Sequence, residues 1–538
     1  MHIWMMGDFW PVLMFETVAI GVTLVIAFRL PQLGSKWFRK VLYGFDRIAR
    51  WRRLSVVLVG LIALGESLVV LLIYLPEPKI HDEFSYLLAA DTFASGRMSN
   101  PAHPMWVHFE SRHIIHQPTY ASKFPPAQGL VLAAGKLIGG HPIVGVKIVL
   151  ALTCAAICWM LQGWLPSRWA LLGGLLAVGR FGAFGYWSQS YWGGAVAALG
   201  GALVFGSLRR IMRRPRVGDA LLMGLGLVVL ANSRPFEGLV VSLPVAVTML
   251  VWMVGKNRPK MQVSMSRVVL PILLILAPTG GTMAIYNRSV TGNMLRMPYQ
   301  VYEAAYNKVP QISMDLTERF KQRSASFIAR KSVARFKKLW FFYLGLPLTV
   351  PLLMLLRRRG RWTHFALLTC GLLMIVFLIE TWVLPHYAAP ITGLIFVLAL
   401  QGMRYLRLCQ YHGRPTGRFI VRAILAILFV SIMFTRLLQL QSVLDDWYQE
   451  PKSWNFHRAR ILAQLREEEG NHLAIVRYEP EHSVHAEWVY NKADIDGAKV
   501  VWARELDADQ NLKLLQYFKG RRVWLVETDA KPPRLLPY

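Results

Sequence analysis

Charged residues are scarce in this sequence. Asp, Glu, Lys and Arg make up only 17% of its 538 residues, whereas roughly a quarter is typical of soluble globular proteins. Hydrophobic residues make up 54%, and several uninterrupted apolar stretches approach the length of about 20 residues that a helix needs to cross a bilayer. The composition therefore excludes an ordinary soluble protein and predicts a polytopic membrane protein.

Cysteine is also scarce, with only four residues in the chain: Cys154, Cys158, Cys370 and Cys409. All four fall in predicted apolar spans or on the basic side of the membrane, which is not the pattern of a disulfide-stapled external domain. No Cys or His surrounds them at the spacing of a zinc site. The cysteines therefore predict neither a disulfide framework nor a metal centre.

Acidic residues are few as well, 31 against 61 Lys and Arg, and the formal net charge is +30. Most of the basic residues lie in short clusters between apolar spans, at 36–53, 209–216, 256–260 and 357–361. Short basic loops of this kind mark the cytoplasmic side of a membrane protein. The charge therefore reflects membrane topology and does not predict nucleic-acid binding.

The apolar stretches predict about twelve transmembrane helices. They lie near 12–30, 54–76, 143–164, 167–185, 190–208, 219–233, 236–254, 268–287, 339–356, 365–384, 387–403 and 419–439. With the basic clusters inside, both termini and the loops 77–126 and 288–338 fall outside. We therefore predict a transmembrane domain over 1–440 that is integral to the plasma (inner) membrane, with its C-terminal part on the external, periplasmic side.

The C-terminal part, 441–538, differs in character from the rest, since residues 440–538 hold 14 Lys and Arg against 16 Asp and Glu. Strands are predicted at 472–479, 498–506 and 521–528, with a helix at 509–520 between the last two. This order predicts parallel pairing through a right-handed crossover. The tail has no P-loop, GxGxxG or nucleophile elbow. It is therefore predicted to be a small soluble α/β domain without a catalytic role.

The most polar loop opens with KIHDEFSYLLAAD at 79–91, directly after an apolar span. The adjacent Asp82 and Glu83 have two explanations. One is helix capping, with Asp82 as the N-cap and Glu83 in the first turn. The other is catalysis, because a carboxylate at the edge of the hydrocarbon is costly and usually functional. One acid would accept a proton from an incoming hydroxyl or amine while the other holds a metal or the acceptor. The residues alone leave both explanations open.

The order of motifs in this loop resembles the GT-C superfamily of integral-membrane glycosyltransferases, in the branch that includes protein mannosyltransferases and the aminoarabinose transferase of lipid A. The motifs are HDEF after an early span, a following helix, SGR, and KFPPAQG before a short apolar helix at 125–140. The resemblance covers about residues 54–440 and is strongest over 77–140. It implies a GT-C-like all-α membrane fold and a transferase that takes a sugar from a polyprenyl-phosphate donor on the outer side.

The resemblance also implies roles for single residues. Asp82 matches the family's catalytic carboxylate, and Glu83 fills the second acidic place as a metal or acceptor contact. Lys123 matches the basic residue that contacts the donor phosphate, and Arg97 is a second candidate; the alternative for Lys123 is a snorkelling flank of the short helix. The Asp82–Glu83 pair departs from a DxD spacing, so dependence on a divalent metal ion (Mg²⁺ or Mn²⁺) stays open.

Two further external turns carry candidate residues. SRPFEG places Arg234 and Glu237 where they either form an ion pair or bind substrate. LPHYAAP places His386 and Tyr387 between two spans. His386 either contacts the donor phosphate or the acceptor, or is merely a hydrogen-bonded interfacial histidine.

Aromatic residues supply the remaining candidates for substrate binding, namely Tyr120, Tyr191 and Trp192. The last two belong to FGAFGYWSQSYWGG at 181–194, which is either an aromatic belt or the lining of a sugar or prenyl groove. The histidines of the first loop fit no zinc template. They are His103, His108, His113 and His116.

These features predict an inverting glycosyltransferase, hexosyl or pentosyl, in which Asp82 deprotonates the acceptor while Lys123 and Arg97 neutralise the polyprenyl phosphate. The expected partners are the lipid-linked donor, a glycan, lipid or protein acceptor, and the bilayer. One alternative is a transporter or flippase of lipid-linked sugars, which would need intramembrane charges or broken helices in repeated halves. The other is a non-catalytic scaffold that displays the C-terminal domain.

Overall fold

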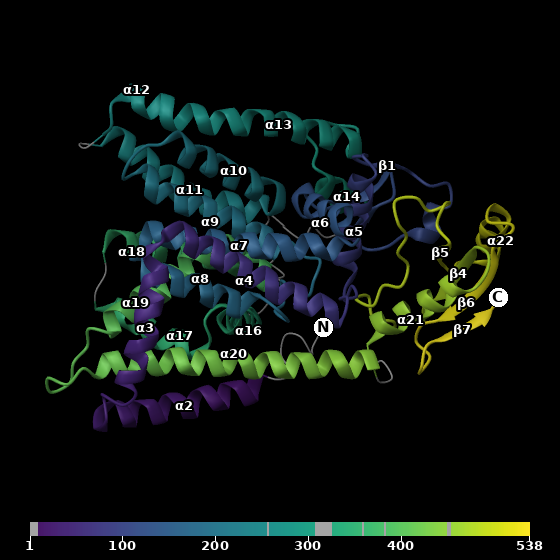
Figure 1. The fold of residues 1–538 in the computed structure, drawn as a ribbon. Helices are drawn as coiled ribbons and strands as arrows, with labels where there is room; N and C mark the ends of the chain where they lie inside the picture. Colours follow the sequence, from purple (N-terminus) through teal and green to yellow (C-terminus); the bar gives the residue numbers. More distant parts are fainter. Residues whose placement is uncertain (1–8, 256–257, 307–324, 358–359, 381–382, 449–452) are drawn as a thin grey trace.

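Long helices lie side by side in a bundle, and a small sheet sits at one end of it (Figure 1). We call this end the sheet end. The structure is a computed structural model and describes residues 9–255, 258–306, 325–357, 360–380, 383–448 and 453–538.

The apolar stretches of the sequence form the helices of the bundle. These are α2 (Phe9–Arg29), α4 (Arg52–Ile73), α7 (Pro142–Trp164), α8 (Ser167–Phe181), α9 (Gly194–Ile211), α10 (Val217–Ser233), α11 (Pro235–Val254), α13 (Leu270–Thr291), α16 (Ala325–Tyr343), α17 (Gly345–Leu352), α18 (Arg361–Ile379), α19 (Thr392–Leu406) and α20 (Thr416–Tyr448). Within the described residues, nine helices are long and apolar enough to cross a membrane, or ten if the bent pair α16–α17 is one span. The chain is therefore a multi-pass membrane protein.

A helix lies at each of the twelve predicted positions, but three of them are not simple spans. α8 and α10 have only 15 and 17 residues. α16 and the helical stretch that starts with α17 meet at a bend of 93°. Gly345 at this bend has φ +63°, a conformation that other L-residues rarely adopt. The fold class is confirmed, while fewer than twelve helices have the length of a complete span.

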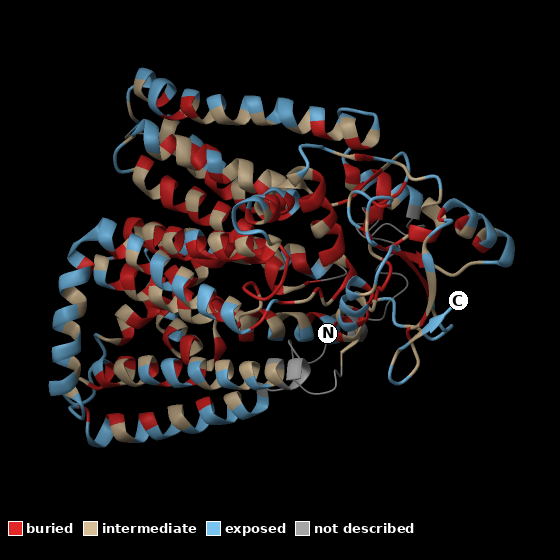
Figure 2. Cartoon of the chain, turned by 45° about the vertical axis from the view of Figure 1, so that its right-hand side comes forward, coloured by how far each residue is buried: buried red, intermediate tan, exposed pale blue. Residues whose placement is uncertain are grey.

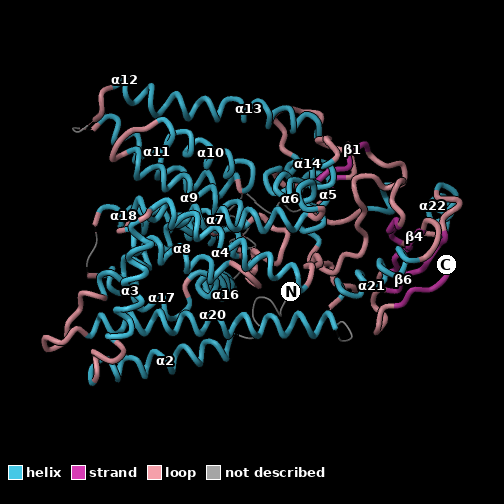
Figure 3. Tube along the Cα trace, in the orientation of Figure 1, coloured by secondary structure: helices cyan, strands magenta, loops and turns pink. Residues whose placement is uncertain are grey.

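One basic cluster forms a helix instead of a loop. α3 (Ser35–Arg50) lies across the end of the bundle opposite the sheet end (Figure 3). It exposes Trp37, Val41 and Tyr43 beside several Lys and Arg. Such an amphipathic helix can lie in the membrane interface. α11 ends and the short α12 (Met261–Ser264) begins at the same end (Figure 1), and residues 256–257 of the basic cluster 256–260 lie outside the described residues.

A layer of short elements covers the sheet end of the bundle. It consists of α5 (His81–Ala94), α6 (Pro126–Gly139), α14 (Pro298–Tyr306), β1 (Asn100–Pro101), β2 (Ile114–Ile115) and β3 (Thr119–Ser122). The three strands pair antiparallel in the order β1-β3-β2. α6 is the short apolar helix of the sequence; Pro126 opens it and Gly140, with φ +74°, ends it. Of the predicted loop 288–338, residues 307–324 lie outside the described residues.

The C-terminal sheet has four strands in the order β5-β4-β6-β7. Its elements are α21 (Trp454–Glu467), β4 (His472–Arg477), β5 (Val500–Arg504), α22 (Ala508–Tyr517), β6 (Arg522–Glu527) and β7 (Arg534–Pro537). β4 is parallel to β5 and to β6, so the three predicted strands run parallel, but the two strands joined by α22 do not pair directly because β4 lies between them. The unpredicted β7 is antiparallel to β6. The predicted domain boundary at residue 440 falls inside α20.

Two buried clusters hold the sheet in place, one on each face. On one face, Leu465 of α21 packs with Ala474 and Trp502 of the strands. The other face packs on α22 and also on the layer at the sheet end, through Leu88 and Tyr120. Figure 2 shows buried residues running from the bundle interior into the sheet. The tail is therefore fixed against the loop that carries Asp82.

Candidate active site

Asp82 and Glu83 lie in the first turn of α5, at the sheet end. Ile80 is the N-cap of this helix, its backbone is extended, and no side chain caps the helix. The capping explanation for Asp82 is therefore wrong. Acidic residues in a first turn still interact favourably with the helix dipole, but the Asp82 carboxylate has other partners.

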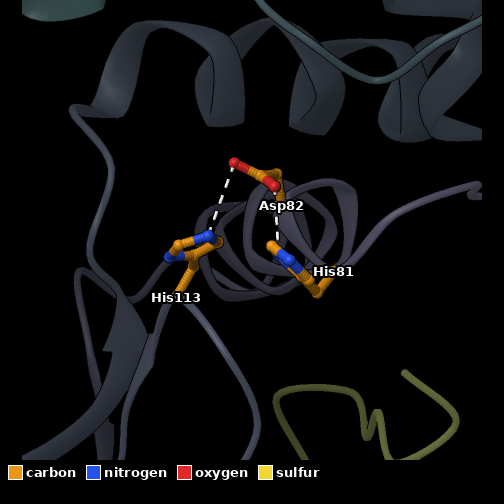
Figure 4. A group of neighbouring side chains, drawn as sticks. All are labelled: His81, Asp82 and His113. Carbon is orange, nitrogen blue, oxygen red and sulfur yellow. Dashed lines mark ion pairs between the residues drawn. The ribbon is translucent and has the colours of Figure 1, made fainter. Parts of the chain in front are cut away.

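Those partners are two histidines (Figure 4). Oδ2 of Asp82 lies 3.0 Å from Nδ1 of His81, and Oδ1 lies 3.6 Å from Nε2 of His113. His113 comes from the turn before β2, where its φ is +67°, which is uncommon for a non-glycine residue. Its backbone is held by hydrogen bonds: the His113 N–H donates to the Tyr302 hydroxyl at 3.0 Å, and its carbonyl accepts from Ser85 Oγ at 2.6 Å.

The electrostatic surroundings keep Asp82 ionised. Burial alone would raise its pKa, but the imidazoles of His113 and His81 and the ammonium of Lys123 together lower the pKa of Asp82 well below its usual value. Its side chain keeps about a quarter of its surface exposed, 27%. Asp82 is thus a charged carboxylate that a substrate can still reach.

Glu83 binds backbone amides instead of joining this cluster. Its Oε2 accepts from the Lys79 N–H at 2.6 Å and its Oε1 from the Tyr191 N–H at 2.8 Å. Burial raises the pKa of Glu83 to about 7, although the two N–H groups favour its charged form. The predicted role of Glu83 as a metal ligand is corrected, because Oε1 ties α5 to the segment before α9 and Oε2 binds the backbone just before α5, and Glu83 does not belong to the cluster of possible metal ligands around Asp82.

Lys123 is buried between aromatic rings beside β3, and only 2% of its surface is exposed. Its Nζ lies 3.6 Å from Oε1 of Glu303 and 4.4 Å and 4.9 Å from the ring centres of Tyr302 and Tyr299. The snorkelling explanation is therefore wrong, since a snorkelling lysine keeps its ammonium in water. Burial lowers the pKa of Lys123 to about 8, and the charges of Glu303 and Asp82 oppose that shift.

The SRPFEG turn forms the predicted ion pair and one more contact. Nη1 of Arg234 lies 3.6 Å from Oε1 of Glu237. The Arg234 guanidinium also lies 4.4 Å from the centre of the Tyr387 ring, within the range of a cation–π interaction. The structure thus joins the two predicted turns, SRPFEG and LPHYAAP, in one group.

His386 belongs to the same group. Its Nδ1 lies 3.0 Å from the Tyr186 hydroxyl, and its ring centre lies 4.3 Å from that of Trp192. Burial lowers the pKa of His386 well below its usual value; the charge of Arg234 adds to this effect and that of Asp82 opposes it. Burial therefore favours the uncharged imidazole at His386, and the charges of both Arg234 and Asp82 act on its pKa.

Three predicted site residues have other contacts. Arg97 follows the far end of α5, about 18 Å along the helix from Asp82 at the usual rise of about 1.5 Å per residue, and its Nε donates to Ser95 Oγ at 3.2 Å. The expectation that Arg97 and Lys123 share one phosphate is therefore corrected. The Tyr120 hydroxyl donates to the Asn491 carbonyl at 2.8 Å, and the Tyr191 hydroxyl to the Pro76 carbonyl at 2.8 Å. Both rings are buried; Tyr120 joins β3 to the tail, and Tyr191 joins the segment before α9 to the segment before α5.

Sequence reasoning missed three histidines near Asp82. His81 is next to Asp82 in the HDEF motif, so the sequence left unknown only whether its side chain turns toward the Asp82 carboxylate. His113 belongs to a set of four histidines whose spacing fits no zinc template. Its partner is a carboxylate from another element, Asp82 of α5. His485 comes from the tail, and its Nδ1 lies 3.3 Å from Nε2 of His81. No sequence signal connects His485 to His81 across 404 positions.

His81, Asp82 and His113 fit a metal ion by geometry. One donor atom from each lies within 4.8 Å of the other two, and two histidines with one carboxylate are a set that Zn²⁺ and other transition metals use. Mg²⁺ prefers oxygen ligands. The donor set therefore favours Zn²⁺ over the predicted Mg²⁺ or Mn²⁺.

No family model and no curated protein sequence matches the chain. Solved structures do match over most of its length. ArnT from Cupriavidus metallidurans in the apo state is 14% identical, covers 88% of this chain and 92% of its own, and gives a TM-score of 0.52. ArnT bound to undecaprenyl phosphate is 15% identical over the same shares, with a TM-score of 0.49.

The archaeal oligosaccharyltransferase AglB from Archaeoglobus fulgidus, in complex with an inhibitory peptide and a dolichol-phosphate, is 11% identical. It covers 89% of this chain and 69% of its own, with a TM-score of 0.47. ArnT and AglB are GT-C glycosyltransferases. The likeness to apo ArnT shows the fold, and the GT-C fold predicted from the sequence is confirmed.

Proposed function

We propose that this chain is a membrane glycosyltransferase that transfers a sugar from a polyprenyl-phosphate-linked donor to an acceptor. The observation that carries this proposal is geometric: the partly exposed carboxylate of Asp82 lies between two imidazoles at the sheet end of a GT-C fold. The buried cation Lys123 is close enough to lower its pKa. The basic α3 at the opposite end favours the cytoplasm there, which supports the proposal that Asp82 faces the external, periplasmic side of the inner membrane.

In the proposed reaction Asp82 takes the proton from an acceptor hydroxyl or amine. The acceptor atom then bonds to the anomeric carbon while the bond from that carbon to the donor phosphate breaks. The electron pair of the broken bond stays on the phosphate oxygen, so attack from the opposite side inverts the anomeric centre. Lys123 stabilises the negative charge that develops on the phosphate.

The low pKa of Asp82 in the free protein does not conflict with its role as a base. A donor phosphate beside Lys123 offsets part of the positive charge that lowers this pKa. Donor binding therefore raises the pKa of Asp82 toward the range in which a general base is effective. Asp82 would then become a stronger base only when the donor is in place.

Arg234 replaces Arg97 as the second cation that we assign to the donor phosphate. Its guanidinium is held by Glu237 and Tyr387, and the charge of Asp82 reaches the same group. Tyr387, His386 and Trp192 are assigned to contacts with the sugar or the acceptor. Glu83, Tyr191 and Tyr120 are positioning residues, because their polar atoms bind the chain itself.

Mass spectrometry of cell-envelope glycans and polyprenyl-phosphate sugars, with and without the protein, tests the proposed function. We expect one polyprenyl-phosphate sugar to accumulate in the absence of the protein and one glycan, lipid or protein to lose that sugar. The purified chain in nanodiscs should then restore the transfer with that donor. Glycans that are identical in both samples would favour a scaffold, and a donor that changes sides without being consumed would favour a flippase.

Metal binding gives a separate prediction. A divalent ion held by His81, Asp82 and His113 would supply positive charge at the acceptor oxygen. The wild-type chain, stripped with a chelator and dialysed against Zn²⁺, should retain about one ion per chain, and His113→Ala should retain much less, because one of three ligands is lost. His103→Ala is the matched control, since His103 of the same loop binds Asp496 at 3.1 Å. Equal metal content in both variants would contradict this site.

A further inference from the structure

A second pocket lies at the other end of α5, between the layer at the sheet end and the tail. It has a volume of about 460 Å³. Asp91, Ser95 and Arg97 line it from the end of α5 and the turn after it, and Lys136 lines it from α6. The opposite wall comes from α21 and from the segment 490–502. None of the cluster His81, Asp82 and His113 lines this pocket, so it is separate from the candidate active site.

The pocket is rich in cations. Six basic side chains line it, against two acidic ones, Asp91 and Asp494. The six are Arg97, Lys136, Arg458, Arg466, Lys492 and Lys499. Lys136 pairs with Asp91 at 2.6 Å, and Asp494 accepts from the Gly497 N–H at 3.0 Å. In the part of the chain that the structure describes, the other five cations form no ion pair.

The cations of the pocket are not all exposed surface residues, because Arg458 is buried and held in place by hydrogen bonds. Its side chain is 7% exposed. Nε donates to the Trp488 carbonyl at 2.8 Å and Nη2 to the Tyr490 carbonyl at 3.2 Å, which fixes the guanidinium at the wall. Burial lowers the pKa of Arg458, and the charge of Glu77, which forms no ion pair with it among the described residues, opposes this shift. A buried charge without a close counter-ion is costly, and a bound anion would remove that cost.

The position of the pocket indicates where the anion comes from. Next to Lys136, α6 exposes Leu137 and Ile138 by 69% and 73%, and apolar residues this exposed at a membrane protein's surface face lipid. The pocket therefore opens near the level of the lipid head groups, where phosphates are abundant. Arginine and lysine together are suited to phosphate, since Arg binds it bidentately and Lys as a point charge.

We infer that this pocket is a second ligand site that binds a phosphate or pyrophosphate group, presented either by an anionic lipid or by a soluble phosphorylated molecule. The inference does not depend on sugar transfer. It also explains Arg97: the residue that the sequence assigns to the donor phosphate contributes instead to this second anion site.

Two probes and one pair of variants test the inference on the full chain. Inorganic pyrophosphate is titrated into nanodiscs of phosphatidylcholine, and phosphatidic acid is offered in the bilayer and detected on the protein by native mass spectrometry. The double variant Arg466→Ala, Lys492→Ala removes two exposed cations of the pocket. The control Lys513→Ala, Lys519→Ala removes two exposed cations, one in α22 and one just after it; α22 packs on the face of the sheet opposite to α21.

We expect the pocket variant to weaken the binding of at least one probe by about tenfold or more, because two charge-assisted contacts are lost, and the control to bind like the wild type. Loss of pyrophosphate alone identifies a soluble ligand, and loss of phosphatidic acid identifies a lipid. The inference is overturned if the wild type binds neither probe, if the pocket variant binds both unchanged, or if both variants lose binding equally.

Discussion

Replacing Asp82 by Asn should lower the rate of sugar transfer by about a hundredfold to ten-thousandfold, the range that a general base contributes. Asn has nearly the same shape but cannot accept the acceptor proton at neutral pH. The variant should still fold, because Asp82 is not the N-cap of α5 and, among the residues that the structure describes, its close partners are the two imidazoles. The measurement is turnover of the purified variant in nanodiscs at saturating donor, with its melting temperature recorded alongside.

The control is Asp496→Asn. Asp496 also pairs with a histidine, His103, at 3.1 Å, but both lie in the contact between the loop and the tail, away from the cluster. Asp496→Asn should therefore transfer sugar at the wild-type rate. If Asp82→Asn folds and retains its rate, Asp82 is not the base.

The helices were predictable because a membrane span has to be apolar along about 20 residues, and that requirement is visible in composition alone. The bend at Gly345 was not predictable from composition, because the predicted span 339–356 is apolar on both sides of this residue. The bend appears only in the backbone conformation. β7 was not predicted, for another reason. Its RLLP run follows two prolines, a pattern that favours coil, but at the edge of a sheet proline is tolerated.

For the site, the sequence could predict residues that act through local motifs. Asp82 and Lys123 each stand in a short motif, and both lie in the same layer at the sheet end. His113 and His485 could not be predicted, because they reach His81 and Asp82 only through the folding of a turn and the docking of the tail. The wrong assignment of Arg97 to the donor phosphate could have been avoided. The helix predicted from Asp82 onward already implies that its far end, before Arg97, lies about 18 Å from Asp82.

Lys123→Met should lower the rate of transfer by about a hundredfold to a thousandfold, the loss expected when one stabilising group is removed from a developing negative charge. Met keeps the length and the apolar stem of lysine, so the packing against Tyr299 and Tyr302 is retained. Because the charge on the phosphate grows in the transition state, the loss should appear in kcat more than in KM. Both constants are measured with the polyprenyl-phosphate sugar that accumulates in the absence of the protein.

A pH profile separates this electrostatic role from a structural one. Burial lowers the pKa of Lys123 to about 8, so the ammonium is present below that pH and loses its proton as the pH rises through it. The wild-type kcat/KM, which reports the pKa values of the free protein, should therefore fall above about pH 8, and the residual kcat/KM of Lys123→Met should lack that fall. Lys513→Met, on the exposed face of α22, should keep the wild-type rate and profile. A Lys123→Met variant with an unchanged kcat and the same decline above pH 8 would mean that another group binds the phosphate, and Arg234, already held by Glu237 and Tyr387, would be the first to replace.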